Sequence, residues 1–295
     1  MADRIPADVP EVPPPLEYAL WQRAAVEAIG TFFLVFVGAG TAAMTLILAH
    51  GAPTYNPDDI GIGALGGAGD WVAIGLAFAF AIMTMVYIFG HVSGQHINPA
   101  VTLALLVRGE ISLPDACVYW VAQFIGATAG AYAIGLVYGH AAWVTGGLGA
   151  AAPFPGVPLW RAGIAEGIGT FLLVLGVYGM AVNKKAPAGW AGFIIALNIG
   201  GVIIMLGNVS GQAINPARAF GPVFADWTLG TATRWDALGV YILAELIGAV
   251  LAAWLYPVVA IRAAGLVRPR GAEGDRDRRD EIAAGGVGQN GGHGF

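Results

Sequence analysis

The chain has 295 residues, of which 57% are hydrophobic and only 11% are charged. Soluble domains contain about 25% charged residues, so this composition excludes an ordinary soluble domain and indicates that lipid surrounds much of the chain. The formal net charge of −5 offers no basic surface, and we expect no nucleic-acid partner. The single cysteine, Cys117, excludes an internal disulfide and a cysteine-based metal site, and we expect neither a metal nor a cofactor.

Six segments are long and apolar enough to be membrane helices, because a helix needs about 20 residues to cross the hydrocarbon. The sequence predicts these spans at residues 21–48, 71–89, 113–138, 160–182, 189–206 and 236–261. The ends of the chain, residues 1–17 and 263–295, are rich in charged residues, proline or glycine, and we predict that both are disordered.

Two short segments that follow the second and fifth predicted spans are nearly identical. Residues 93–100 read Ser-Gly-Gln-His-Ile-Asn-Pro-Ala, and residues 210–217 read Ser-Gly-Gln-Ala-Ile-Asn-Pro-Ala. Each opens a short helical segment, with proline at the first helical position and asparagine before it as a cap. A buried helix start presents free N–H groups and a positive dipole end. Two such starts at membrane depth would point at one place and act as a filter.

The internal similarity extends beyond these motifs. Residues 25–32 (Ala-Val-Glu-Ala-Ile-Gly-Thr-Phe) recur as residues 164–171 (Ile-Ala-Glu-Gly-Ile-Gly-Thr-Phe). The repeated unit is therefore three spans and one half-helix, and an odd number of spans places the two units in opposite orientations. We predict an all-α membrane protein with six transmembrane helices, two re-entrant half-helices and an inverted three-span repeat. The predicted units are residues 18–139 and 160–262, joined by an extracytoplasmic loop at 140–159.

The distribution of basic residues predicts the topology. With six spans both termini share one side, which also holds Arg108 and the Lys184-Lys185 connection. Apart from Arg218, the opposite side carries only Arg161 and Arg234. The positive-inside rule therefore predicts a multi-pass protein of the cell (inner or plasma) membrane with both termini in the cytoplasm.

Two Asn-Pro-Ala motifs in register with an internal repeat, the second followed by Arg218, resemble the aquaporin, or major intrinsic protein, family. The resemblance covers residues 21–262. It implies a water channel in each subunit of a homotetramer, within a lipid bilayer. The motif residues that would line the pore are Asn98, Pro99, Ala100, Asn215, Pro216 and Ala217.

The resemblance also implies a constriction. Arg218 stands where the family has an arginine that repels protons and cations while donating hydrogen bonds to neutral solutes. The alternative is an arginine that snorkels to the membrane interface. Counting back from the motifs, the other constriction residues would be Phe78, Ile203 and Gln212.

The predicted constriction matches neither of the family's main patterns. Water-selective members have His at Ile203 and a small residue or Cys at Gln212. Glycerol-selective members have Trp at Phe78, Gly at Ile203 and Asp at Ala219. The chain is more similar to microbial aquaporins that carry Ile at the histidine position.

Several other polar residues lie within the predicted spans and motif loops. By resemblance, Glu27 and Glu166 are structural anchors for the backbone of the motif loops; a proton relay is the alternative. We interpret the symmetry-related Gln123 and Glu245 as helix-packing groups. The histidines of the first motif loop, His91 and His96, are interpreted as loop-bracing groups rather than metal ligands.

The sequence thus predicts a passive channel for water and small uncharged solutes that excludes protons and ions, and no enzymatic activity. A glycerol-type facilitator is the alternative within the family, although Ala219 counts against it. A coupled secondary transporter also uses inverted repeats with broken helices, and it would need coupling-ion ligands at the midplane.

Overall fold

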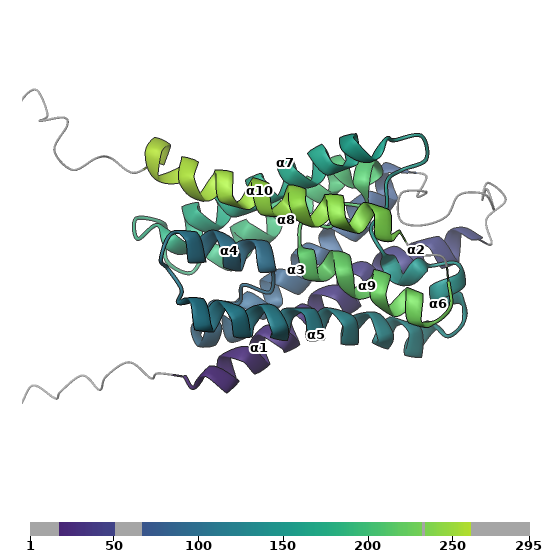
Figure 1. Ribbon diagram of the computed structural model, residues 1–295, viewed down its shortest axis with the longest axis horizontal. Helices are drawn as coiled ribbons and strands as arrows, with labels where there is room; N and C mark the ends of the chain where they lie inside the picture. The colour runs from purple at the N-terminus through teal and green to yellow at the C-terminus, as the bar shows by residue number, and fades with distance from the viewer. Residues whose placement is uncertain (1–17, 51–66, 232–233, 261–295) are drawn as a thin grey trace, which may run out of the picture. The chain divides into compact units, whose positions relative to one another are not determined.

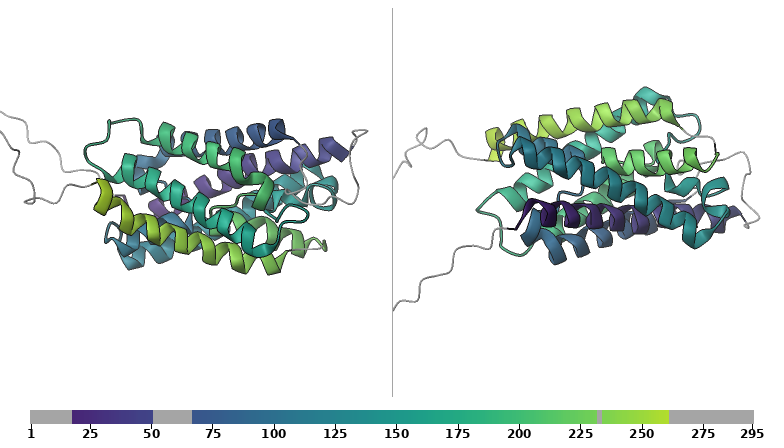
Figure 2. Two further views of the ribbon diagram at one scale, coloured as in Figure 1. Left: turned by 90° about the horizontal axis from the view of Figure 1, so that it is seen from above. Right: turned by 60° about the horizontal axis from the view of Figure 1, so that its bottom comes forward.

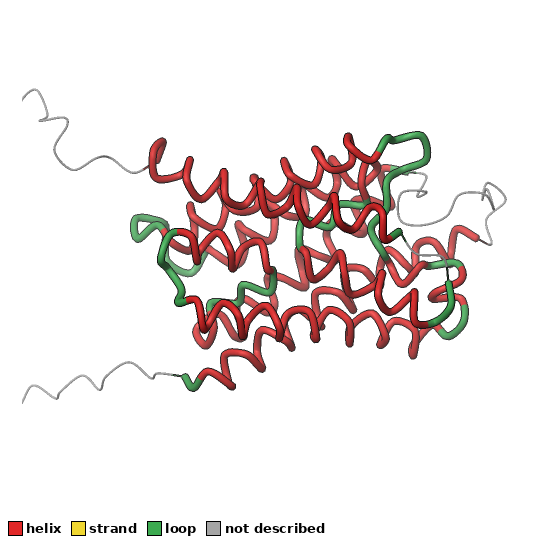
Figure 3. Tube along the Cα trace, viewed as in Figure 1, coloured by secondary structure: helices red, strands yellow, loops and turns green. Residues whose placement is uncertain are grey.

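The computed structural model of the chain describes residues 18–50, 67–231 and 234–260. These residues form helices joined by loops, with no strand among them (Figure 3). Internal contacts group the chain into one unit that ends at Tyr256 and a second that begins at Pro257. Of the second unit only residues 257–260 are described. The predicted tails, at 1–17 and 263–295, lie outside the described residues.

Six helices in the described chain are long and apolar enough to cross a membrane, as predicted. They are α1–η1–α2 (Leu20–Phe33, Leu34–Ala39 and Gly40–His50), α3 (Ala68–Ser93), α5 (Leu113–Tyr138), α7–η4 (Leu159–Val177 and Tyr178–Val182), α8 (Ala191–Ser210) and α10 (Trp235–Ala260). The prediction for α5 matches both of its ends. The largest differences are at α3 and α8, which continue to the serine of each motif because that last turn is still helical.

Two shorter helices, α4 (Pro99–Val107) and α9 (Pro216–Thr228), follow the motifs. Their first residues face each other near the middle of the bundle, and the helices run in opposite directions from there (Figure 1). α4 packs on α5 and α7, and α9 packs on α5. The tilted and top views show the long helices surrounding this pair (Figure 2). This is the predicted arrangement of an inverted repeat with two re-entrant half-helices.

The segment predicted as a plain connecting loop, residues 140–159, is partly helical and packed. It contains α6 (Ala141–Val144) and the short 3-10 turn η3 (Gly147–Gly149), and it buries Leu148 completely. The Phe154 N–H donates to the carbonyl oxygen of Val209 at 3.0 Å. This connection therefore supports the end of α8, directly before the second motif.

Many large apolar side chains are exposed on the outside of the described bundle. Leu136 is 87% exposed and Met205 is 72% exposed. A soluble monomer rarely exposes so much contiguous apolar surface, whereas helices that face lipid require it.

Equivalent glycines bring the first helix of each repeat against the last. A methyl group at Gly126 of α5 would overlap the carbonyl oxygen of Ala28 on α1. In the second repeat, a methyl group at Gly248 of α10 would overlap the carbonyl oxygen of Gly167 on α7. Small residues permit such backbone contact between membrane helices, where close packing replaces the hydrophobic effect.

We predict that Gly248→Ala lowers the stability of the protein by about 1–3 kcal/mol, because the added methyl group must push α7 and α10 apart. The matched control on the same helix is Gly239→Ala, since no atom lies within 4 Å of a Cβ there. The control should melt at the wild-type temperature or slightly above it. Thermal unfolding in detergent checks both variants, and equal shifts for the two would contradict the assignment of a tight crossing.

Candidate functional site

Each half-helix begins at a capping asparagine. The Asn98 Oδ1 accepts a hydrogen bond from the Ala100 N–H at 2.9 Å. The Asn215 Oδ1 accepts from the N–H groups of Ala217 at 3.0 Å and Arg218 at 3.2 Å. Proline occupies the first helical position in both cases, where the lack of an N–H has no cost. The capping oxygens leave the amide nitrogens of both side chains available for other partners.

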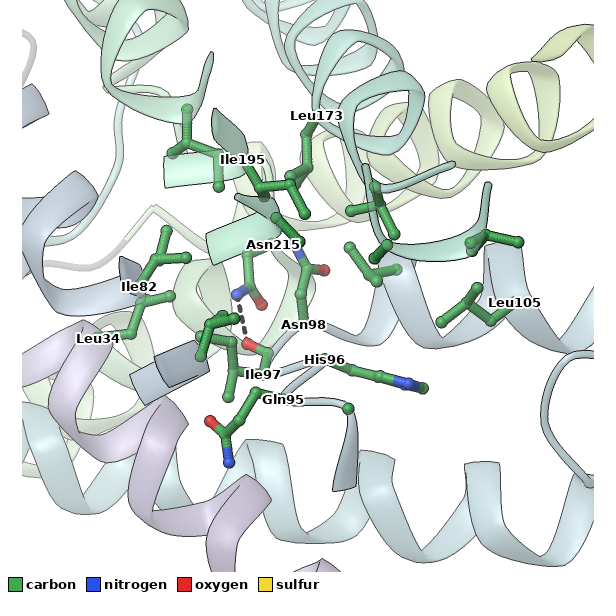
Figure 4. Close-up of a pocket in the computed structure, with 18 of the residues that line it drawn as sticks. Leu34, Ile82, Gln95, His96, Ile97, Asn98, Leu105, Leu173, Ile195 and Asn215 are labelled. Carbon is green, nitrogen blue, oxygen red and sulfur yellow. Dashed lines mark hydrogen bonds between the residues drawn. The ribbon is translucent and has the colours of Figure 1, made fainter. Parts of the chain in front are cut away.

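The two asparagines bind each other's loops. The Asn98 Nδ2 donates to the carbonyl oxygen of Ile214 at 2.8 Å, and the Asn215 Nδ2 donates to that of Ile97 at 2.8 Å. Figure 4 shows the second of these bonds. Each amide nitrogen has two N–H groups, and one is used in this way. Both asparagines also line a cavity.

The loops before the asparagines have a strained backbone. Gln95 and Ile97 have φ values of 47° and 43°, and Gln212 and Ile214 have values of 42° and 46°. Residues other than glycine rarely adopt this left-handed region, and isoleucine does so at a cost of order 1–3 kcal/mol. Such a backbone persists only where its surroundings hold it, and both loops are held by a carboxylate.

In the first repeat that carboxylate is Glu27, which is fully buried on α1. It accepts hydrogen bonds from Ser93 Oγ at 2.6 Å, the His96 N–H at 2.9 Å and the Ile97 N–H at 2.6 Å. Hydrogen bonds donated to a charged acceptor are about twice as strong as those between neutral groups. The loop is thereby fixed to the first helix of its repeat.

In the second repeat Glu166 of α7 holds the motif loop in the same way. It is fully buried and accepts from the N–H groups of Ala213 at 2.9 Å and Ile214 at 2.7 Å. The two carboxylates therefore bind equivalent backbone positions of the two loops.

A second pair of contacts comes from the last helix of each repeat. The Gln123 Nε2 donates to Glu27 Oε2 at 2.9 Å, and Glu245 Oε1 accepts from the Asn215 N–H at 3.0 Å. We interpreted this pair as helix-packing groups. Gln123 does join helices, because its Nε2 donates to Glu27 on α1 and to Thr102 on α4, whereas Glu245 binds the backbone of the second motif.

Sequence reasoning missed two tyrosines. The hydroxyl groups of Tyr119 and Tyr241 donate to the carbonyl oxygens of Ser93 at 3.0 Å and Ser210 at 2.7 Å. The signal was present, because each tyrosine stands four residues before Gln123 or Glu245 in the repeat. That spacing places both on one helix face.

A cavity of about 330 Å³ adjoins the asparagines on the side of the bundle where α4 ends. Its wall is mostly aliphatic, with Ile82 of α3 and Ile195 and Ile199 of α8 (Figure 4). The polar groups at the wall include Asn98, Asn215, His96, Gln95 and Glu110. A largely apolar wall with a few donors binds passing water weakly, which suits conduction.

The two histidines predicted to brace the first loop differ in their contacts. His96 is half-buried, with Nδ1 3.1 Å from Thr102 Oγ1 and its ring edge-on to Tyr119. His91 is exposed and contacts the ring of Tyr18 instead. The described residues contain no group of three or more His, Cys, Asp or Glu side chains suited to hold a metal ion.

Arg218 lies in the first turn of α9 and is completely buried, so it does not snorkel to the surface. Its guanidinium carbon is 5.2 Å from the centroid of the Phe78 ring. None of its three side-chain nitrogens has a hydrogen-bond partner within the described part of the chain. Buried donors without a partner are costly unless a polar molecule visits them.

Phe78 and Ile203 lie one helical turn beyond residues that line the cavity. Phe78 is four residues before Ile82 on α3, and Ile203 is four residues after Ile199 on α8, so each lies one turn along the same helix face. Both side chains are buried, at 3% and 1% exposure. Because α3 and α8 pack against each other, the two residues lie beyond the same end of the cavity.

The prediction for Gln212 is wrong in the direction of its side chain. The Gln212 Nε2 donates to the carbonyl oxygen of Ala165 on α7 at 3.2 Å, and its Oε1 accepts from Ser210 Oγ at 3.3 Å. The amide packs over Gly169, where a methyl group would overlap it. The side chain thus fastens the loop to α7 and is not available to fill a constriction beside Arg218.

Gln95 makes the equivalent contact in the first repeat. Its Nε2 donates to the carbonyl oxygen of Val26 at 2.8 Å, and its amide packs over Gly30. Counting residues back from the motif predicts only that such a side chain lies near the loop. Its direction depends on the left-handed backbone and on the facing glycine.

Fold and site together define a membrane protein built around two half-helices that meet end to end. The chain belongs to the major intrinsic protein family, whose model matches residues 16–256. This family consists of membrane channels and not of enzymes, and with its six apolar helices the chain is a multi-pass membrane protein.

Individual relatives agree with this assignment. Aquaporin AqpM from Methanothermobacter marburgensis is 48% identical over 238 residues, which cover 81% of this chain and 97% of that protein. A probable aquaporin AqpM from Archaeoglobus fulgidus is 49% identical over 241 residues, covering 82% and 98%. The glycerol uptake facilitator protein-like 6 of Lactiplantibacillus plantarum is 35% identical, covering 79% and 95%.

The fold itself is similar to a solved structure, the aquaglyceroporin from Plasmodium falciparum. The TM-score is 0.67 at 24% sequence identity, over 82% of this chain and 97% of that one. At this identity the likeness shows the fold alone.

We predict that Glu27→Gln destabilises the protein by about 1–3 kcal/mol, because an amide nitrogen cannot accept the hydrogen bonds that one carboxylate oxygen accepts. The control is Glu110→Gln on the exposed connection after α4, which should change stability by less than about 0.5 kcal/mol. Thermal unfolding in detergent measures both. If Glu27→Gln unfolds at the same temperature as the control, Glu27 does not hold the first loop.

Proposed function

We propose that the protein is a passive channel for water and small uncharged solutes that excludes protons and ions. The observation that carries this proposal is the buried guanidinium of Arg218, which has no hydrogen-bond partner among the described residues and lies over Phe78. It stands beyond the end of a cavity that reaches both asparagines. The names of the AqpM relatives support it.

The asparagines would orient the molecules that pass. Their free N–H groups donate from two opposing loops toward one place, so a water molecule there presents its oxygen to both donors. Its own hydrogens then point away along the pore, which interrupts a proton-conducting chain. The positive ends of α4 and α9 add an electrostatic barrier to cations at the same level.

Arg218 would form the second barrier. Its fixed charge repels cations and protons, while its nitrogens donate to a neutral solute. The proposed constriction is Arg218, Phe78 and Ile203, without the side chain of Gln212. The proposed pore motifs are Asn98, Pro99, Ala100, Asn215, Pro216 and Ala217, with Glu27 and Glu166 as anchors.

We place the protein in the cell membrane with both termini in the cytoplasm. The cavity is lined by Val182 and Glu110, next to the basic residues Arg108 and Lys184. The positive-inside rule supports a cytoplasmic opening at that end. The proposed halves are residues 18–139 and 160–262, with the loop 140–159 outside, and the family suggests a homotetramer.

Glycerol transport is the second candidate. The Gln212 side chain binds α7, so the proposed constriction contains two apolar side chains, Phe78 and Ile203, and one polar side chain, Arg218. A solute with an alkyl chain and hydroxyl groups fits such a wall. The relative named as a glycerol uptake facilitator is in keeping with it. Ala219, where glycerol-selective members have Asp, favours water.

The test is stopped-flow light scattering of proteoliposomes that contain the purified protein. We expect fast osmotic water flux with a low activation energy, and separate runs with glycerol and a dissolved gas measure the range of solutes. Water flux equal to that of empty vesicles would refute the proposal. Saturable uptake driven by an ion gradient would favour a coupled secondary transporter instead.

Arg218→Val should retain water flux but raise proton permeability by about tenfold or more, corresponding to ~1.4 kcal/mol of lost barrier. The reason is that valine removes the fixed charge and opens the constriction. A pH-sensitive dye inside the vesicles measures the leak. The control Arg161→Ala removes an exposed arginine at the start of α7 and should remain proton-tight; an equal leak in both variants would show that Arg218 is not the barrier.

A further inference from the structure

The second motif loop is held by two carboxyl groups, whereas the first is held by one carboxylate and one amide. Glu166 and Glu245 are both fully buried, and they accept hydrogen bonds from the consecutive N–H groups of Ile214 and Asn215, which places the two carboxyl groups close together. Glu166 uses both oxygens on backbone N–H groups, and Glu245 uses Oε1 on the Asn215 N–H. The Oε2 of Glu245 is buried and has no partner in the described chain.

The first repeat shows which kind of group belongs at that position. Gln123 is the equivalent of Glu245, and its Nε2 donates to Glu27 Oε2 at 2.9 Å. The neighbouring tyrosines, Tyr119 and Tyr241, make the same contact in both repeats, so the helix faces that carry Gln123 and Glu245 are placed alike. The equivalent contact in the second repeat requires a donor at Oε2 of Glu245. A carboxylate has none, and a carboxylic acid has one.

The charges around the site agree with this. Three charged or titratable groups bind or adjoin the same loop as Glu245: Glu166 from α7, Arg218 from α9 and, one turn earlier on α10 itself, Tyr241. Two ionised carboxylates in contact and away from water repel each other strongly, and Arg218 supplies only one positive charge. A single proton between the carboxyl groups removes the repulsion.

We propose that Glu245 is a neutral carboxylic acid that donates its Oε2 proton to Glu166 and accepts from the Asn215 N–H, and thereby positions the second motif. It acts through Asn215 and Arg218, so it is a positioning residue. Its neutrality means that Arg218 is balanced by Glu166 alone. Loss of the proton adds a second negative charge near Arg218 and weakens the barrier to cations.

The consequence for transport rests on the proposed channel function. The channel should exclude cations less well at alkaline pH, where Glu245 loses its proton. The first repeat adds no such pH dependence, because Gln123 cannot ionise. The protonation state itself does not depend on what the protein transports.

Infrared spectroscopy of the full-length protein in lipid vesicles tests the protonation state. A buried carboxylic acid has a carbonyl band separate from that of a carboxylate, and we expect this band in the wild type at neutral pH. Glu245→Gln should remove it and should still fold, since glutamine retains both hydrogen bonds. The matched variant Gln123→Glu should add a second band by creating the same pair in the first repeat.

Absence of the band from the wild type overturns the proposal, whatever the variants do, and so does a band that survives in Glu245→Gln. If that variant does not fold, the wild-type band together with the gain in Gln123→Glu supports the proposal. Failure of the wild type to conduct water would refute the channel function and leave the infrared result standing.

The pH dependence of the cation leak is a further test, because it would not change if Glu245 had a purely structural role. In wild-type vesicles the leak should rise with alkaline pH by up to about tenfold per pH unit, following the ionised fraction of Glu245. Vesicles with Glu245→Gln should show no such rise. Equal profiles for the two proteins would overturn the link between Glu245 and the charge at Arg218.

Discussion

The pair of hydrogen bonds between the asparagine side chains and the opposite loops is the contact on which the centre of the molecule depends. It joins segments from the two halves of the chain and brings two helix starts together. Neither loop is stable in this form by itself, because four residues with side chains have a left-handed backbone. Glu27 and Glu166 offset that strain by accepting backbone N–H groups inside the protein, where ionic hydrogen bonds are strong.

Glycines make this arrangement possible at two levels. Gly30 and Gly169 leave room for the glutamine side chains that fasten the loops to α1 and α7. Gly126 and Gly248 then allow the first and last helices of each repeat to touch through their backbones. The carboxylates on one helix and the amide or acid on the other can therefore reach the same loop. Close helix packing and loop geometry are parts of one constraint.

Much of this fold could be predicted from the sequence because membrane helices and internal repeats leave strong signals. Hydropathy located the six spans, and the repeat of Glu27 at Glu166 indicated the inverted halves. The direction of the Gln212 side chain could not be predicted, because it depends on a backbone angle and on Gly169, which is distant in sequence. The packing of residues 140–159 was missed for a similar reason, since short helices and turns have little periodicity.

The function that we propose depends on where the two halves differ. His96 in the first loop corresponds to Ala213 in the second, and Val101 in the first half-helix corresponds to Arg218. Val101 lines the apolar cavity, whereas Arg218 is a buried charge at the opposite end of the pathway. The symmetric contacts build two half-helices that start alike, and the presence of arginine where the other half has valine gives the proposed pathway an apolar side and a charged side. In the function that we propose, Arg218 adds a charged barrier at one end to the barrier at the asparagines, while the apolar side lets neutral molecules leave without binding.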